Sequence, residues 1–210
     1  MNRILLVDDH AVVRDGIKRM FEDRAGSVQF GEAESPETAL KLAEAQEWDI
    51  VVLDIALAHR SGLEALKDLK KLRPRVPVLI LSMHSEEQYA RRAFRAGASG
   101  YITKDCSREE LLSAVQKVIN GSRYVSPALA EKLVVDLERG SDGPPHETLS
   151  DREFEVLQLI ASGKTVSEIA EILSLSDKTI STYRARILEK MGMKTNAELT
   201  HYAIQNKLVG

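Results

Sequence analysis

Charged side chains stand at the ends of two apolar runs. Asp54 follows the run from 50 to 53, and the pair Asp8 and Asp9 follows the run from 4 to 7. Unbroken Val, Ile and Leu runs are typical of strands buried on both faces of a parallel sheet, and ligands bind beyond the carboxyl ends of such strands. Three carboxylates at one edge repel each other unless a cation neutralises them, and oxygen ligands favour Mg²⁺ over zinc or copper. These residues therefore predict a magnesium site.

Two further apolar runs end in groups that suit an anion. Ser82 ends the run from 77 to 82, and Lys104 ends the run from 100 to 104. A hydroxyl can bond an oxygen of a transferred anion, and an ammonium group supplies a point charge beside it. A carboxylate can accept a phosphoryl group when cations neutralise the charge of the transition state, so we predict phosphoryl transfer to Asp54. Each group alone would be read as a solvated strand end, but five of them in equivalent positions favour a site.

The periodicity between these groups predicts the elements that position them. Strands are expected at 4–7, 28–33, 50–53, 77–82 and 100–104. Serine-led helix starts are predicted at Ser35, Ser85 and Ser107, the last two as capping boxes with Gln88 and Glu110. Strands that alternate with helices indicate an α/β fold, and we predict a doubly wound five-stranded parallel sheet with five helices over residues 1–121.

The composition restricts the class of protein. With 210 residues the chain is long enough for two domains, and a formal net charge of -3 excludes a globally basic nucleic-acid binder but not a local basic face. No run approaches the roughly 18 apolar residues that span a bilayer, and the N-terminus has a strand pattern rather than that of a signal peptide. The single cysteine, Cys106, cannot form an internal disulfide and is read as an inert small residue. We expect a cytoplasmic protein without a membrane partner.

The first 121 residues resemble the receiver domain of two-component response regulators, which has a flavodoxin-like fold. Such domains carry an acidic pair after the first strand, an acceptor aspartate after the third, Ser or Thr after the fourth, an aromatic residue in the fifth and a lysine at its end. The matching residues are Asp8, Asp9, Asp54, Ser82, Tyr101 and Lys104. The resemblance implies that a sensor histidine kinase phosphorylates Asp54. It also implies that the domain, although not an enzyme, assists its own phosphorylation and dephosphorylation.

The same resemblance assigns roles around the acceptor. It implies that Asp9, Asp54 and the backbone carbonyl of Ala56 bind Mg²⁺ directly, whereas Asp8 acts mainly through water. Ser82 and Tyr101 would form the switch. By resemblance to other receivers, phosphate on the acceptor should draw in the Ser82 hydroxyl, and Tyr101 should then turn inward and change the surface near the fourth and fifth helices.

One residue departs from the receiver pattern. The family usually has proline four residues after the acceptor, where this chain has Ala58. Without proline the loop is less restricted. We expect this difference to affect the rigidity of the loop and the rate of phosphorylation, since no metal ligand or acceptor is lost.

Two other functions fit parts of the pattern. A metal-dependent phosphatase with Asp54 as nucleophile would need an acid or base beside it, but the residue two positions on is Ala56, and the second half of the chain would be unexplained. Turnover of a phosphate ester would identify such an enzyme. A receiver that acts as a protein-interaction platform without phosphate would not need the acidic pair, Ser82 and Lys104.

The chain changes character between residues 122 and 147. A helical pattern at the start of this segment is carried by Ala128, Leu129, Leu133, Val134 and Leu137. The small polar and proline residues 140–145 at its end sustain neither a helix nor a sheet ladder. We predict a linker over 122–147 with a helical start and a flexible end.

From 148 to 210 the periodicity is helical throughout. Helix starts are predicted at Ser150, Thr165 and Ser176, the first two as capping boxes with Glu153 and Glu168. The third helix should reach about Met191, and a fourth should run from Asn196 to about Asn206. This spacing suits a helix-turn-helix, although an ordinary helical hairpin would have the same caps.

Charge favours DNA binding by the third of these helices. Between Lys178 and Lys194 there are five basic side chains and one acidic side chain, as contact with phosphates requires. Ile180, Ile187 and Met191 share a face that should be buried, which turns a small polar face outward. The predicted DNA contacts are Ser181 and Thr182 at base edges, Lys178, Thr179 and Arg186 nearer phosphates, and Arg184 at the border between the two faces.

Three segments of this half, 149–157, 168–170 and 175–180, closely resemble the LuxR-type helix-turn-helix. The chain departs from it at Ser181 and Tyr183, where many members have lysine and histidine, which leaves the target sequence open. A receiver followed by this module defines the NarL/FixJ-like response regulators. The resemblance implies a transcription regulator that binds double-stranded promoter DNA as a homodimer, with the fourth helix as a dimer contact and RNA polymerase as a candidate partner.

Overall fold

The computed structural model describes residues 2–21, 28–57, 62–131 and 144–209. The chain forms two compact units, Met1–Val134 and Val135–Gly210. The first unit contains the sheet, and the second is built from helices alone in its described part.

The sheet of the first unit has five parallel strands in the order β2-β1-β3-β4-β5. The strands are β1 (Asn2–Val7), β2 (Val28–Ala33), β3 (Ile50–Leu53), β4 (Val78–Ser82) and β5 (Gly100–Thr103). Every residue of the central strands β3 and β4 is buried, because helices cover both faces of the sheet. The predicted strands and the α/β class are confirmed.

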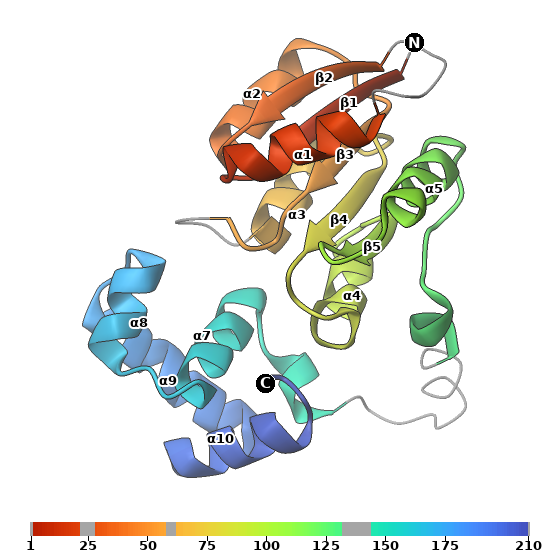
Figure 1. Cartoon of the computed structure of the whole chain (residues 1–210). Helices are drawn as coiled ribbons and strands as arrows, with labels where there is room; N and C mark the ends of the chain where they lie inside the picture. Colours follow the sequence, from red (N-terminus) through yellow and green to blue (C-terminus); the bar gives the residue numbers. More distant parts are fainter. Residues whose placement is uncertain (1, 22–27, 58–61, 132–143, 210) are drawn as a thin grey trace. The chain divides into compact units, whose positions relative to one another are not determined.

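Helices α1 to α5 form the outer layers of the described part of this unit (Figure 1). They are α1 (Ala11–Phe21), α2 (Pro36–Ala45), α3 (Gly62–Leu72), α4 (Glu86–Arg95) and α5 (Arg108–Ile119). Helices α1 and α5 contact each other and share one apolar cluster with the residues of one face of the sheet. Helix α3 contacts both α2 and α4, which gives the doubly wound arrangement. In this arrangement all five strands end at the same edge.

Most of the predicted helix starts are present. Ser35 and Ser107 accept hydrogen bonds from backbone N–H groups of α2 and α5. Ser85 is the N-cap of α4, but among the described residues its side chain makes no capping hydrogen bond. The predicted capping box with Gln88 therefore lacks the bond that the Ser85 side chain should accept. The β-region backbone of Ser85 still lets the helix begin at the expected residue.

The first part of the predicted linker packs on the first unit. Tyr124 pairs with Gly100 in an isolated bridge and donates a hydrogen bond from its hydroxyl to Glu110 Oε1 at 2.8 Å. Residues 127–131 are helical, and Leu129 is buried. The compact unit reaches Val134, and Tyr124 packs in its apolar core. Of the other residues expected to form this helix and the end of the linker, Leu133, Val134, Leu137 and 140–143 lie outside the described residues.

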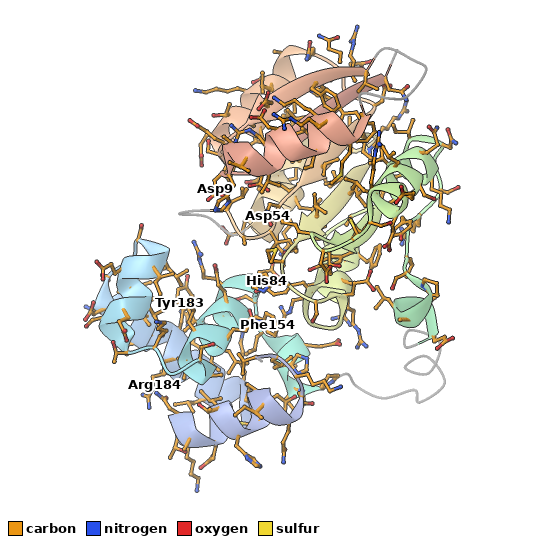
Figure 2. The ribbon with its side chains drawn as sticks, in the orientation of Figure 1. Asp9, Asp54, His84, Phe154, Tyr183 and Arg184 are labelled. Atoms are coloured by element: carbon orange, nitrogen blue, oxygen red, sulfur yellow. The ribbon has the colours of Figure 1, made fainter. Side chains whose placement is uncertain are left out.

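The second unit has four α-helices in its described part, preceded by a 3₁₀ turn, η1 (Pro145–Thr148). The helices are α7 (Asp151–Ala161), α8 (Val166–Leu173), α9 (Asp177–Met191) and α10 (Asn196–Gln205). Both predicted capping boxes are formed, at Ser150 with Glu153 and at Thr165 with Glu168. Phe154 of α7 is fully buried in the small core (Figure 2). Across the described residues, no helix has the length and apolar character needed to cross a membrane.

One buried ion pair joins two helices of this unit. Glu153 is 3% exposed, and its Oε2 accepts hydrogen bonds from Lys190 Nζ at 2.6 Å and from the Ser150 backbone N–H at 2.8 Å. Burial raises the pKa of Glu153, but the bonds from Lys190 and Ser150 outweigh burial and leave the pKa below its ordinary value. A carboxyl with a lowered folded-state pKa stabilises the fold above its unfolded pKa, and this contribution is lost as the pH falls through the folded value.

We expect Lys190→Ala to destabilise the second unit by about 2 kcal/mol. The value lies below the ~3–5 kcal/mol cost of breaking a fully buried pair, since the Lys190 side chain is 39% exposed. The difference in unfolding free energy between the wild type and the variant should largely disappear in acid, below the ordinary Glu pKa of 4.5. Native-state hydrogen exchange of the α7 amides across a urea series measures it, with the exposed Lys194→Ala as control. A difference that persists undiminished in acid would show that the effect is not electrostatic.

Candidate functional site

The predicted charged groups meet at the C-terminal edge of the sheet, where Figure 2 labels Asp9 and Asp54. Asp8 follows β1, Asp54 follows β3 and Lys104 follows β5. Lys104 Nζ lies 2.6 Å from Asp8 Oδ2 and 2.6 Å from Asp54 Oδ2. Both carboxylates are 3% exposed. One ammonium group therefore bridges two buried carboxylates from different strands.

The environment keeps Lys104 charged. Burial lowers the pKa of this lysine, but the hydrogen bonds from Lys104 to Asp54 and Asp8 outweigh it and raise the pKa above its ordinary value. Lys104 is thus an ammonium ion at neutral pH, beside the carboxylate predicted to receive the phosphoryl group. It can place a positive charge where negative charge develops during transfer.

His10 lies beside the acidic pair Asp8 and Asp9 and was not among the predicted site residues. His10 Nδ1 lies 2.7 Å from Asp9 Oδ1 and 3.3 Å from Asp8 Oδ1, and the His10 backbone N–H donates to Asp8 Oδ1 at 2.8 Å. One ligand-type atom from each of the three side chains lies within 4.8 Å of the others. Arg14 Nη1 donates to the Asp8 carbonyl oxygen at 2.6 Å and so fixes the backbone of this turn. The signal available in the sequence was the position of His10 directly after the acidic pair.

Backbone contacts fix the acceptor strand end. The Asp54 backbone N–H donates to the Val7 carbonyl at 2.9 Å, and the Ala56 backbone N–H donates to Asp54 Oδ1 at 3.0 Å. Gly62, at the start of α3, approaches so closely that a Cβ atom there would lie 2.4 Å from the Asp54 carbonyl oxygen and 2.5 Å from Ile55 Cα. Only glycine fits at this position. The sequence alone gave no indication of this requirement. Ala58, the departure from the receiver pattern, lies outside the described residues.

The predicted switch residues are joined through the backbone of His84. The His84 N–H donates to Ser82 Oγ at 3.2 Å, and its carbonyl accepts from the Tyr101 hydroxyl at 2.8 Å. Ser82 and Tyr101 are both 0% exposed. Burial raises the pKa of Tyr101 well above its usual range, so the hydroxyl remains a donor. Tyr101 is therefore turned inward and bonded to the segment that follows Ser82.

In the second unit, α8 and α9 are joined by a short turn. Ser174 ends α8 in the left-handed conformation, with φ of 52°, and Ser176 caps α9. Ser167 Oγ of α8 donates to Asp177 Oδ2 at the start of α9 at 2.7 Å. Ile180, Ile187 and Met191 are buried, as predicted. The opposite face of α9 is consequently presented to solvent.

The predicted DNA contacts differ in how freely they face solvent. Lys178, Ser181, Thr182 and Arg186 are exposed, and Thr179 is partly exposed. Arg184 Nε donates to Asn196 Oδ1 at 2.6 Å, so this side chain is directed toward the start of α10 (Figure 2). The Lys190 ammonium is held by Glu153, and its charge is partly neutralised. The freely exposed positive charge of α9 is therefore carried by Lys178 and Arg186.

One flank of α9 forms a shallow pocket of about 350 Å³. The pocket is lined by Ser176, Lys178, Thr179, Thr182, Tyr183 and Arg186. The hydroxyl groups and the two cations of this pocket suit a phosphate group. Ser176 and Tyr183 were not among the predicted DNA contacts. The signal that could have identified Tyr183 was its spacing of four residues from Thr179 and three from Arg186.

Two protein families match the two units of the chain. Residues 4–116 match the response regulator receiver domain, and residues 147–203 match the bacterial regulatory proteins of the luxR family. The response regulator GacA of Pseudomonas protegens is 37% identical over 209 residues, which cover 100% of this chain and 98% of that protein. The response regulator UvrY of Escherichia coli O6:H1 is 36% identical over 209 residues, which cover 99% of this chain and 96% of that protein.

Solved structures agree with this assignment. RcsB from Salmonella enterica serovar Typhimurium, bound to promoter rprA in the presence of the phosphomimetic BeF3-, is 25% identical with a TM-score of 0.65, over 96% of this chain and 98% of that chain. A two-component response regulator of the LuxR family from Aurantimonas sp. SI85-9A1 is 37% identical with a TM-score of 0.59, over 66% of this chain and 98% of that chain. The chain belongs to the NarL/FixJ class of two-component response regulators, which are DNA-binding transcription regulators with a receiver domain and a LuxR-type helix-turn-helix.

Proposed function

We propose that this chain is switched by a phosphoryl group that Asp54 accepts from a sensor histidine kinase, and that the switched form binds promoter DNA as a homodimer. The observation that carries the proposal is the contact of Lys104 with Asp8 and Asp54, each at 2.6 Å, at the edge where the sequence predicted the chemistry. RNA polymerase is a candidate partner at the promoter. The proposed site of action is the cytoplasm, where the protein would meet its DNA.

Receiver domains bind Mg²⁺ in an acidic pocket, and the residues of this chain fit that ion. Asp8 and Asp9 offer carboxylate oxygens in one cluster, and Asp54 shares Lys104 with Asp8. We assign Asp9, Asp54 and the Ala56 carbonyl as direct ligands, with Asp8 acting mainly through water. Bound Mg²⁺ would neutralise negative charge on the phosphoryl oxygens.

The chain's own groups account for the transfer. A carboxylate oxygen of Asp54 forms the new bond to phosphorus, while the bond from phosphorus to the donor breaks and its electron pair leaves with the donor. The Lys104 ammonium stabilises the charge on the transferred oxygens, and the Ser82 hydroxyl donates a hydrogen bond to one of them. Ala56 offers no side-chain acid or base two residues beyond the acceptor. The acyl phosphate should therefore persist as a signal rather than turn over rapidly as in a phosphatase.

The DNA contacts of the proposal lie on α9. Lys178, Thr179 and Arg186 are assigned to phosphates, and they line the same pocket. Ser181 and Thr182 are assigned to base edges. Thr182 Oγ1 donates to the Lys178 carbonyl at 2.9 Å, so its methyl group and oxygen lone pairs remain for DNA. Arg184 keeps a secondary role, because its bond to Asn196 competes with DNA.

A small phosphodonor tests the proposal directly. We expect one phosphoryl group per chain by intact-mass spectrometry with Mg²⁺ present and none in excess chelator. We also expect phosphorylated protein to retard a subset of genomic fragments in a gel shift. A chain that turns over a phosphate ester without retaining label would instead identify a phosphatase.

We expect Lys178→Ala to weaken binding to all DNA sequences. It should reduce the slope of log affinity against log salt by about 0.9, because one phosphate contact is lost. Titrations on promoter and random DNA over a salt series measure both effects. The control is Lys41→Ala, which removes an exposed charge from α2 in the other unit. An unchanged salt slope would show that Lys178 contacts no phosphate.

Thr182→Ala should alter preference among sequences instead. We expect a change of about 1 kcal/mol at one base position, most clearly where the base offers an amino group or a thymine methyl. Binding to a set of single-base variants of the promoter site measures this change. If Thr182→Ala weakened binding equally to every variant site, Thr182 would contact a phosphate rather than a base.

A further inference from the structure

A side-chain contact ties α4 to the segment that leaves the first unit. Ser126 Oγ donates to Glu86 Oε2, and Glu86 is the first residue of α4. Ser126 also begins the helical residues 127–131, since its hydroxyl accepts from the Leu129 N–H at 3.2 Å and its carbonyl accepts from the Ala130 N–H at 3.0 Å. The start of this helix is therefore bonded to the start of α4.

A second set of contacts links the start of α4 to the acceptor edge. His84 lies between Ser82 and Glu86 in the chain. Its backbone N–H bonds Ser82 Oγ at 3.2 Å, its carbonyl accepts from Tyr101, and its ring centroid is 4.7 Å from that of Tyr89 in α4. The Ser82 hydroxyl thus contacts the backbone of His84, a residue whose ring packs on α4.

The chain just before Ser126 is held by other elements. The Tyr124 backbone N–H donates to the Ser99 carbonyl at 3.0 Å, and the Tyr124 hydroxyl donates to Glu110 Oε1 of α5 at 2.8 Å. These contacts are made to Ser99, directly before β5, and to α5. A displacement of Glu86 would therefore pull on Ser126 against an anchored neighbour and reorient the helix that begins there.

We propose that the hydrogen bond between Glu86 and Ser126 transmits the phosphorylation state of Asp54 to residues 127–131, the start of the segment that connects the two units. The inference rests on the proposed phosphorylation of Asp54. When the Ser82 hydroxyl turns to a phosphoryl oxygen, it leaves the His84 N–H, and the segment 83–86 is released to move. Glu86 and Ser126 are positioning residues in this scheme, since neither touches the reacting atoms.

The test is hydrogen exchange of the Leu129 and Ala130 amides in the full-length protein, with and without a small phosphodonor. In the wild type we expect phosphorylation to change these exchange rates several-fold. Glu86→Ala leaves the Ser126 cap in place but removes the link, so the difference should vanish while Asp54 is still phosphorylated to the same extent. Glu86→Gln keeps a carbonyl oxygen as acceptor and should restore the difference, which a purely structural loss would not allow.

The matched control is Ser122→Ala, an exposed serine of the same segment, which should behave as the wild type. The inference is overturned if Glu86→Ala keeps the full phosphorylation-dependent difference, or if Ser122→Ala abolishes it. A wild-type chain that takes up no phosphoryl group would overturn the proposed function and this inference together. Normal labelling of Glu86→Ala, with the phosphorylation-dependent difference in exchange retained, overturns the inference alone.

Discussion

Asp54→Asn is expected to abolish phosphorylation of the chain, with labelling reduced to background. Asparagine keeps the shape of the side chain but has no carboxylate to form the bond to phosphorus. It also removes one of the two negative charges beside Lys104, so the ammonium would form an ion pair with Asp8 alone. Incubation with a labelled small phosphodonor and Mg²⁺, followed by intact-mass spectrometry, measures the loss.

The control for this prediction is Asp49→Asn. Asp49 is exposed and directly precedes β3, so it stands at the opposite end of the same strand, where its Oδ2 accepts a hydrogen bond from the Arg3 backbone at 2.7 Å. This variant should be phosphorylated as the wild type. Labelling that survives in Asp54→Asn, or proceeds undiminished in excess chelator, would show that the acceptor lies elsewhere.

The sequence predicted the sheet and the site edge because both depend on local signals. A run such as 50–53 has no polar face, so it must be buried on both sides, and the polar residue after it must lie at the strand end. Parallel strands bring these ends together, which is why Asp8, Asp54 and Lys104 could be placed at one edge before any contact was known. The 2.6 Å contacts of Lys104 agree with that placement.

Other features depend on contacts between distant segments and had no local signal. The close approach of Gly62 to the Asp54 backbone depends on how α3 packs. The sequence shows only the length of the loop before α3, not the path of that loop. The bond from Arg184 to Asn196 joins residues of two different helices, so a helical wheel of α9 could place Arg184 only at a border. The ion pair between Glu153 and Lys190 also joins two helices, so the sequence count included Lys190 among the charges available to DNA.

Phosphorylation is expected to convert the protein from mostly monomer to mostly dimer and to tighten its binding to paired half-sites. Two receivers that pair raise the effective concentration of the second helix-turn-helix beside its half-site, so affinity rises without any new base contact. We expect a gain of about a hundredfold or more on a promoter with two half-sites about one helical turn apart, and little gain on a single half-site. Sedimentation and binding titrations on both DNAs measure the change.

The spacing of the half-sites separates this mechanism from its alternative. Moving one half-site by about half a helical turn places it on the opposite side of the duplex and should remove most of the gain, since a paired dimer cannot reach both sites. Phosphorylation could instead free a DNA-binding domain that the receiver blocks. Release of that kind would tighten binding equally on single, paired and displaced half-sites and would leave the sedimenting mass unchanged, because each domain would then bind by itself.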